Sequence, residues 1–144
     1  MKVFLGSDHA GFKLKEEIKK FLEKKGIKYA DMGTDSEEPC DYPDYAKKVA
    51  KEVAKNKNDL GVLVCGTGTG TAITANKVKG VRAAQATNTF LAKMAREHNN
   101  ANILSLGARV NTPKEALEMV DVFLNTPFSN EERHKRRVKK MEKK

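Results

Sequence analysis

The chain has 144 residues, enough for one domain with a substantial buried core. Lys and Arg outnumber Asp and Glu by 28 to 19, giving a formal net charge of +9 at pH 7. Hydrophobic residues make up 39% of the chain and are spread evenly, which excludes a disordered protein. No apolar run approaches the ~20 residues that a membrane span requires.

The N-terminal sequence, MKVFLGSDHAG, has a short apolar stretch followed at once by charged residues, and it does not resemble a secretory signal. We therefore expect a cytoplasmic protein without a membrane partner. In that compartment the two cysteines, Cys40 and Cys65, are expected to be reduced rather than joined in a disulfide.

Residues 2–7 and 27–33 are predicted strands, separated by a helix over 12–26 whose apolar residues recur at helical spacing. A second amphipathic helix is predicted over 43–56. The run LGVLVCG at 60–66 is nearly all apolar, as expected of a strand that is buried on both faces.

The second half of the chain continues the alternation. A short helix over 69–78 precedes a strand over 81–87, and a helix over 89–98 precedes a strand over 102–108. A further helix over 112–125 has a clear start signal. Its first residues are Thr112 as N-cap, Pro113 at the first helical position and Glu115 to complete a capping box.

Strands that alternate with helices predict an α/β fold: a Rossmann-like three-layer sandwich with a five-stranded parallel sheet, forming a single domain over residues 1–144. Ligands of such sheets bind at the carboxyl ends of the strands. The loops that follow the strands at 2–7, 60–66 and 102–108 are therefore expected to share one edge of the sheet.

The C-terminal segment is strongly basic and is predicted as a last helix over about 129–144. Its final fourteen residues, EERHKRRVKKMEKK, hold eight Lys or Arg against three Glu, so +5 of the net +9 lies there. Such a run is usually a solvated helix face. It could also bind phosphate, either on a nucleic acid or on a small metabolite, and composition does not choose between these.

The segment CGTGTGT at 65–71 follows a strand and opens a helix. A dinucleotide fingerprint starting at Gly66 needs glycine where Thr71 stands, and one starting at Gly68 needs it where Ile73 stands. The Gly-Lys-Ser/Thr of a Walker loop is also missing, so NAD and ATP are disfavoured. The free amides of this loop could hold a small anion or a developing oxyanion. Alternatively, the turn needs glycine for its backbone angles alone.

Cys65 is the sharpest candidate for chemistry. A free cysteine at a strand end is more often packing, but a position beside a helix N-terminus favours the thiolate, which can act as nucleophile or base. Asp8 and His9 follow the first strand on the same expected edge, although Asp8 could simply cap the next helix. His98 ends a helix, where its side chain could interact favourably with the negative end of the helix dipole. No ligand spacing supports a metal site, and Cys40 is assigned no role.

Six segments in chain order carry a resemblance to a known family. They are GSDHAG (6–11), DYPDYA (41–46), CGTGTG (65–70), ANKVKGVRAA (75–84), REHNNANILSLGARV (96–110) and RHKRRV (133–138). Together they resemble type B ribose-5-phosphate isomerase, whose broader family includes galactose-6-phosphate and allose-6-phosphate isomerases. The resemblance implies an aldose–ketose isomerase of the pentose phosphate pathway, without metal or cofactor, that interconverts ribose 5-phosphate and ribulose 5-phosphate through an enediolate.

The resemblance also implies roles for particular residues. Cys65 would be the base, with Thr67 beside the reacting carbons, and His98 would open the furanose ring with Asn99 and Asp8 nearby. The implied substrate contacts are Asp8, His9, Tyr42, Gly66, Gly68, Thr69, Gly70, Asn99, Arg109, Arg133, His134 and Arg137. The site would be shared between subunits of a homodimer or a dimer of dimers, with the basic C-terminal helix reaching the partner.

The sequence departs from the family pattern at several positions. Ala72 replaces a frequent pocket serine, and Glu131 and Glu132 replace two glycines. One branch has a glutamate base at position 71, where this chain has Thr71, so Cys65 is the remaining base. These changes bear on which sugar fits. The alternatives are a six-carbon sugar phosphate, allose 6-phosphate or galactose 6-phosphate, and a non-catalytic nucleic-acid binder that uses the tail; we expect no nucleic-acid partner.

Overall fold

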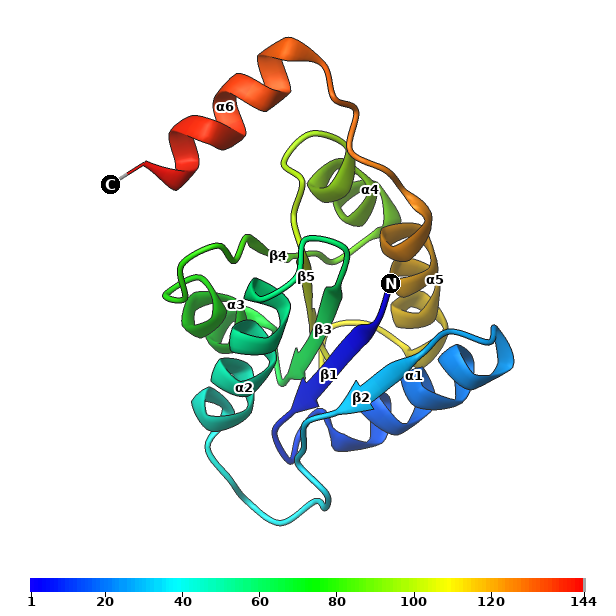
Figure 1. Ribbon diagram of the computed structural model, residues 1–144. Helices are drawn as coiled ribbons and strands as arrows, with labels where there is room; N and C mark the ends of the chain where they lie inside the picture. The colour runs from blue at the N-terminus through cyan, green and yellow to red at the C-terminus, as the bar shows by residue number, and fades with distance from the viewer. Residues whose placement is uncertain (144) are drawn as a thin grey trace.

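The computed structural model describes residues 1–143 and contains one parallel sheet with helices on both faces (Figure 1). Its strands are β1 (Val3–Ser7), β2 (Tyr29–Asp31), β3 (Leu60–Cys65), β4 (Ala83–Gln85) and β5 (Ile103–Gly107). Its helices are α1 (Phe12–Lys24), α2 (Tyr42–Ala54), α3 (Thr69–Ala75), α4 (Thr89–Glu97), α5 (Pro113–Asn125) and α6 (Glu132–Glu142). The predicted Rossmann-like three-layer sandwich with five parallel strands is confirmed.

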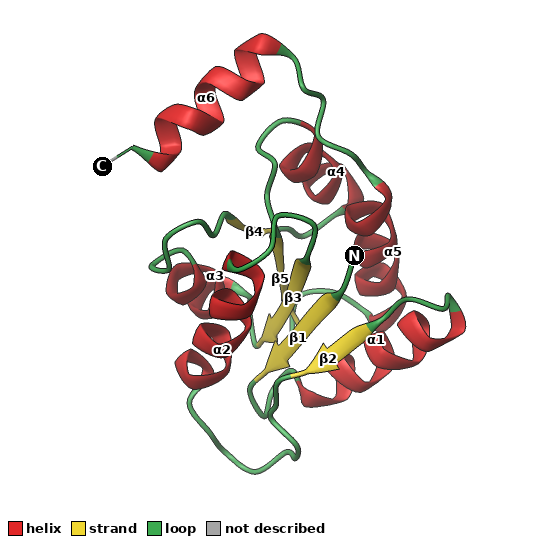
Figure 2. Cartoon of the chain, in the orientation of Figure 1, coloured by secondary structure: helices red, strands yellow, loops and turns green. Residues whose placement is uncertain are grey.

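The strand order is β2-β1-β3-β5-β4, so β3 is the middle strand. From β1 the chain continues to β2 on one side of the sheet. From β3 it continues to β4 and β5 on the other side. The order therefore reverses between β1 and β3, and this reversal is where open α/β sheets bind their ligands. Figure 2 shows the carboxyl ends of the strands gathered at the lower edge of the sheet.

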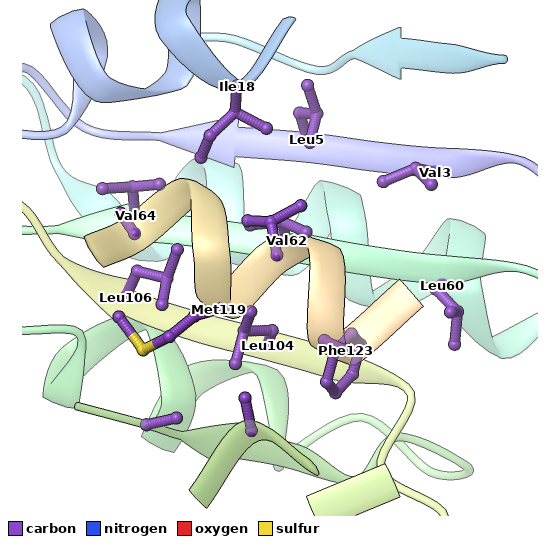
Figure 3. Packing of buried hydrophobic residues seen from close by; sticks show 14 of the residues in the cluster. Val3, Leu5, Ile18, Leu60, Val62, Val64, Leu104, Leu106, Met119 and Phe123 are labelled. Carbon is purple, nitrogen blue, oxygen red and sulfur yellow. The ribbon is translucent and has the colours of Figure 1, made fainter. Parts of the chain in front are cut away.

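Two hydrophobic cores hold the layers together. The larger one lies between the sheet and α1, α4 and α5, where Val62 and Leu104 pack near Met119 and Phe123 (Figure 3). The smaller one lies under α2 and α3 and contains Leu63 among others. Every residue of β3 is buried because its two faces meet different cores, and this explains the nearly continuous apolar run in the sequence.

The differences from the predicted elements lie mainly at the edges of the fold. β2 and β4 are three residues long, shorter than predicted, because each is an edge strand with a partner on one side only. The capping box of α5 is confirmed, with Glu115 N–H donating to Thr112 Oγ1 at 3.2 Å and Thr112 N–H to Glu115 Oε1 at 2.8 Å. The C-terminal helix begins at Glu132 rather than near residue 129, and Lys144 lies outside the described residues.

Helix α6 stands apart from the sandwich, at the edge opposite the carboxyl ends of the strands (Figure 1). Among its eleven residues, all of them described, His134 alone is buried. Its end contacts the segment before β4 through Arg82, whose Nη1 lies 2.6 Å from Glu142 Oε1, and a cavity of about 610 Å³ is lined by both segments. Within residues 1–143, no helix has the length and apolar character needed to cross a membrane.

Candidate active site

Cys65 ends the middle strand, paired with Gly107 of β5, and 5% of its surface is exposed. Its Sγ accepts a hydrogen bond from the backbone N–H of Gly68 at 3.2 Å. Gly68 has a φ of +84°, a conformation that favours glycine. A Cβ at this position would also lie 2.9 Å from the carbonyl carbon of Leu106. Glycine is therefore required for the turn, and the same turn aims an amide at the sulfur.

Two hydroxyls complete the surroundings of the sulfur. Thr71 Oγ1, in α3, lies 3.3 Å from Cys65 Sγ and 2.7 Å from Ser105 Oγ of β5. Ser105 Oγ donates to the Gly68 carbonyl at 2.8 Å. The sequence analysis missed both contacts, since it considered Thr71 only as a residue unable to replace the base. The available signal was a serine in the middle of the apolar strand ILSLG.

The glycine-rich turn is held from two sides. Tyr42, at the start of α2, lies over Gly70, where a Cβ would be 2.5 Å from the ring. From the end of β4, the Gln85 side chain donates to the Thr67 carbonyl and to Thr69 Oγ1, both at 2.9 Å. The structure thus brings Tyr42, one of the implied substrate contacts, to the turn. It adds Gln85, which no motif indicated.

Asp8 and His9 follow β1 on the same edge as Cys65. Asp8 Oδ1 accepts the Gly11 N–H at 3.0 Å in the turn before α1. Gly11 is the N-cap of α1 and the helix has no side-chain cap, so the interpretation of Asp8 as a helix cap is wrong. His9 Nδ1 accepts the Cys40 N–H at 3.1 Å. A neutral ring that accepts at Nδ1 carries its proton on Nε2, which is then free to donate to a ligand.

Arg109 brings a cation to this edge. Its backbone N–H donates to the Gly66 carbonyl at 2.9 Å, and its guanidinium Nη1 lies 3.0 Å from where a Cβ of Gly66 would stand. The side chain is exposed. One edge of one chain thus carries a thiol, an amide-lined turn and a cation, together with Asp8 and His9.

A second group of predicted residues gathers elsewhere. The rings of His98, which caps the C-terminus of α4, and His134 of α6 are stacked with their centroids 4.3 Å apart. His134 is 4% exposed, and its Nδ1 lies 2.6 Å from Ser129 Oγ. Burial lowers the pKa of His134, and the charges of His98 and Arg133 lower it further, while Glu131 opposes them. Arg133 is exposed on the same helix.

The two groups lie at opposite edges of the sheet. The chain runs from His98 into β5 at its start, Ile103, whereas Cys65 pairs with the end of β5 at Gly107. At about 3.3 Å per residue, this strand alone separates them by roughly 13 Å. Within one chain, Asp8 is therefore separated from His98 and its neighbour Asn99. Of the three histidines, His9 lies at the edge that carries Cys65, and His98 and His134 lie at the opposite edge. Among the described residues, no three His, Cys, Asp or Glu side chains gather as metal ligands.

The fold and the site define a class: a Rossmann-like α/β protein with a free thiol and an amide-rich turn at the point where its strand order reverses. A family model described as Ribose/Galactose Isomerase matches residues 3–141. The chain therefore belongs to the Ribose/Galactose Isomerase family.

Named relatives agree with this assignment. Ribose-5-phosphate isomerase B of Mycolicibacterium paratuberculosis is 44% identical over 139 residues, which are 96% of this chain and 87% of that protein. The structure of ribose-5-phosphate isomerase B from Clostridium thermocellum is similar with a TM-score of 0.96 and 49% identity, covering 99% of this chain and 95% of that one. The structure of the Mycoplasma genitalium enzyme with bound ribulose-5-phosphate has a TM-score of 0.94 and 43% identity, covering 98% and 93%.

Proposed function

We propose that this protein interconverts ribose 5-phosphate and ribulose 5-phosphate, with Cys65 as the base. The observation that carries the proposal is the contact between Cys65 Sγ and the Gly68 N–H at 3.2 Å, at the carboxyl edge of the sheet. A sulfur in this position has the electropositive surroundings that a thiolate requires. The names of the relatives, including one solved with bound ribulose-5-phosphate, support the choice of a five-carbon sugar.

The reaction needs one base and one anion site. In the open-chain aldose, the Cys65 thiolate takes the proton from C2, the C2–H electrons form the C1–C2 double bond, and the C1 oxygen becomes negative. The amides of the turn at 66–70 stabilise that oxyanion. The thiol then returns the proton to C1, and the O2 proton passes to O1 as C2 becomes the carbonyl. Thr67, exposed on the turn, lies beside the reacting carbons.

The phosphate lies away from the thiol and is held by cations and hydrogen-bond donors. Arg109 and the Nε2 of His9 supply two of these contacts at the edge that carries Cys65. Arg133 and Arg137 are exposed on α6 at the opposite edge of the same chain. They reach this phosphate from a second subunit.

The proposed enzyme is a homodimer, alone or as a dimer of dimers, in which each site combines the two edges of two chains. His98, Asn99 and the residues of α6 from one subunit complete the Cys65 site of the other. Within its own chain, α6 is held by the stacking of His134 on His98 and by the ion pair of Glu142 with Arg82. Most of its other side chains are exposed, and they are available to a partner subunit.

Both cysteines, which lie in the described part of the chain, are unpaired. A base at Cys65 has to remain a free thiol, which fits a reducing compartment such as the cytoplasm.

The decisive experiment is the substitution Cys65→Ala. The proposal expects a folded protein with the wild-type circular dichroism spectrum and turnover of ribose 5-phosphate reduced by at least about a thousandfold, as for other essential acid–base groups. Cys40→Ala is the matched control for the loss of a thiol, since it keeps the backbone N–H that donates to His9 Nδ1 at 3.1 Å and loses only the 4.0 Å contact of the sulfur with that nitrogen. Wild-type rates in Cys65→Ala would show that another group is the base.

The same assay decides the substrate. Ribose 5-phosphate is expected to give the highest kcat/KM when compared with allose 6-phosphate and galactose 6-phosphate. A higher kcat/KM for either six-carbon sugar phosphate would show that this sugar phosphate is the preferred substrate. Absence of turnover on all three, combined with salt-dependent binding of nucleic acid that survives Cys65→Ala, would favour the nucleic-acid alternative.

A further inference from the structure

The proposed reaction has not used two buried hydroxyls near Cys65, one in contact with the sulfur and one bonded to the first. The side chains of Thr71 and Ser105 come from different elements, α3 and β5, and both residues are fully buried. Their hydroxyls form a chain from the sulfur inward: Cys65 Sγ to Thr71 Oγ1 at 3.3 Å, Thr71 Oγ1 to Ser105 Oγ at 2.7 Å, and Ser105 Oγ to the Gly68 carbonyl at 2.8 Å. Thr71 Oγ1 also lies 3.3 Å from the Gly68 carbonyl, a longer contact than its bond to Ser105. Each hydroxyl in such a chain has one proton to donate, so all of them must donate in the same direction if each is to have both a donor and an acceptor.

With Cys65 as a thiol, the protons can all point inward. The S–H donates to Thr71 Oγ1, the Thr71 hydroxyl donates to Ser105 Oγ, and the Ser105 hydroxyl donates to the Gly68 carbonyl. Every hydroxyl then donates once and accepts once. The Gly68 N–H still donates to the sulfur at 3.2 Å.

With Cys65 as a thiolate, the direction reverses. The Ser105 hydroxyl donates to Thr71 Oγ1, and the Thr71 hydroxyl donates to the sulfur, which now accepts from Thr71 and from the Gly68 N–H. The Gly68 carbonyl keeps a partner, since the Ala72 N–H donates to it at 3.2 Å. Both states are satisfied without moving any heavy atom.

We infer that Thr71 and Ser105 are positioning residues whose reversible pair of hydroxyls keeps the Cys65 sulfur hydrogen-bonded in both of its protonation states. This rests on the proposed function, in which Cys65 takes a proton and returns it in each turnover. A hydrogen bond donated to an anion is stronger than one between neutral groups. The pair therefore stabilises the thiolate. Because it can reverse direction, it also provides a hydrogen-bond acceptor for the thiol after the sulfur has been protonated.

The first test removes the hydroxyl that touches the sulfur. In Thr71→Val, which keeps the side-chain shape, the midpoint of the pH dependence of Cys65 alkylation by iodoacetamide is expected to rise by about one pH unit. Mass spectrometry of the peptide that contains Cys65 separates this reaction from that of Cys40. Thr71→Ser, which keeps the hydroxyl, should retain the wild-type midpoint.

The matched control lies one turn along the same helix. Thr74 Oγ1 donates to the Gly70 carbonyl at 2.8 Å and is not bonded to the sulfur. Thr74→Val therefore loses a threonine hydroxyl from α3 without touching the proposed pair. Its midpoint should match the wild type.

The second test asks whether Ser105 acts through Thr71. Ser105→Ala alone should raise the midpoint by less than Thr71→Val does, and it should add nothing in a Thr71→Val background, because Ser105 is not bonded to the sulfur. The pair therefore predicts a non-additive double-mutant cycle. The acid limb of kcat/KM on ribose 5-phosphate should move with the alkylation midpoint, while KM stays unchanged.

Two results would overturn the inference: an unchanged midpoint in Thr71→Val, or additive effects of the two substitutions. Alkylation reports on the thiol without any substrate. A chain that fails to isomerise ribose 5-phosphate but shows the predicted midpoints would refute the proposed function alone. An active isomerase whose midpoints do not move would refute the hydroxyl pair alone.

Discussion

At the scale of single residues, Gly68 combines requirements that no other residue type meets. Its backbone is left-handed, its Cα faces the Leu106 carbonyl, and its N–H donates to Cys65. Gly68→Ala is expected to lower the free energy of unfolding by about 2 kcal/mol or more, from left-handed strain and a steric clash together. Turnover should fall as well, because the turn has to shift away from β5 and its amide leaves the sulfur.

Gly26 provides the matched control. It has a φ of +70°, but a Cβ there would meet no atom within 4 Å. Gly26→Ala should cost only the left-handed strain of about 1 kcal/mol and leave kcat/KM unchanged. Urea unfolding and steady-state kinetics on both variants make the comparison. If Gly68→Ala and Gly26→Ala lost the same free energy of unfolding, contact with Leu106 would not be the reason that position 68 requires glycine.

The sequence predicts some of these residues better than others. Cys65 and the glycine turn are predictable because a local pattern, an apolar strand followed by glycines, fixes their surroundings. Thr71 and Ser105 meet across 34 positions of the sequence, and Gln85 reaches back 16 positions to Thr69. Such contacts depend on how two elements are packed, and a pattern within one element does not carry that information.

At the scale of elements, one ion pair joins α1 to β2. Lys15 is 1% exposed, and its Nζ lies 2.6 Å from an oxygen of Asp31, which also accepts from Lys19 at 2.9 Å. Asp31→Asn leaves the buried ammonium of Lys15 without its nearest counter-charge and should lower the free energy of unfolding by about 3 kcal/mol. Glu17→Gln removes an exposed pair with Lys20 and should cost less than about 1 kcal/mol.

The same pair makes stability depend on pH. Burial by itself raises the pKa of Asp31, but hydrogen bonds from the two lysines and from the Gly33 amide outweigh it and lower the pKa below its usual 3.8. The stabilisation is therefore complete above pH 3.8 and is lost as the pH falls through the lower, folded-state value. The difference between wild type and Asp31→Asn should narrow below about pH 4. A constant difference down to pH 2 would contradict this account.

At the scale of the whole molecule, the separation of Cys65 from His98 makes a test by complementation possible. Two inactive variants, Cys65→Ala and His98→Ala, are combined in one dimer by co-expression with two different affinity tags. If sites are shared across a two-fold interface, one of the two sites is intact and the mixed dimer regains about half of the wild-type activity. A dimer of two Cys65→Ala chains with the same tags is the control and should remain inactive. No recovery in the mixed dimer would place the whole site within one chain.

The order of elements was predictable for the whole fold, since alternating strands and helices leave few topologies open. The ends of β2, β4 and α6 were less so. The first two pair with only three residues of their single neighbouring strand, although β1 and β5 each continue for two residues more. For α6, the run of charged residues indicates a helix without marking its first residue, and the loop before it is fixed by contacts such as that between Ser129 and His134.

The place of β3 in the middle of the sheet determines how rigid the catalytic end is. Cys65 lies at the end of a strand with hydrogen-bonded neighbours on both sides and both faces covered. Exposing its amides to solvent requires β1 or β5 to detach, an opening that approaches global unfolding in cost. In hydrogen exchange, the amides of β3 should therefore be among the slowest in the molecule. We expect this anchoring to hold the thiol in place before substrate binds, because the strand that carries it is the best-supported one in the sheet.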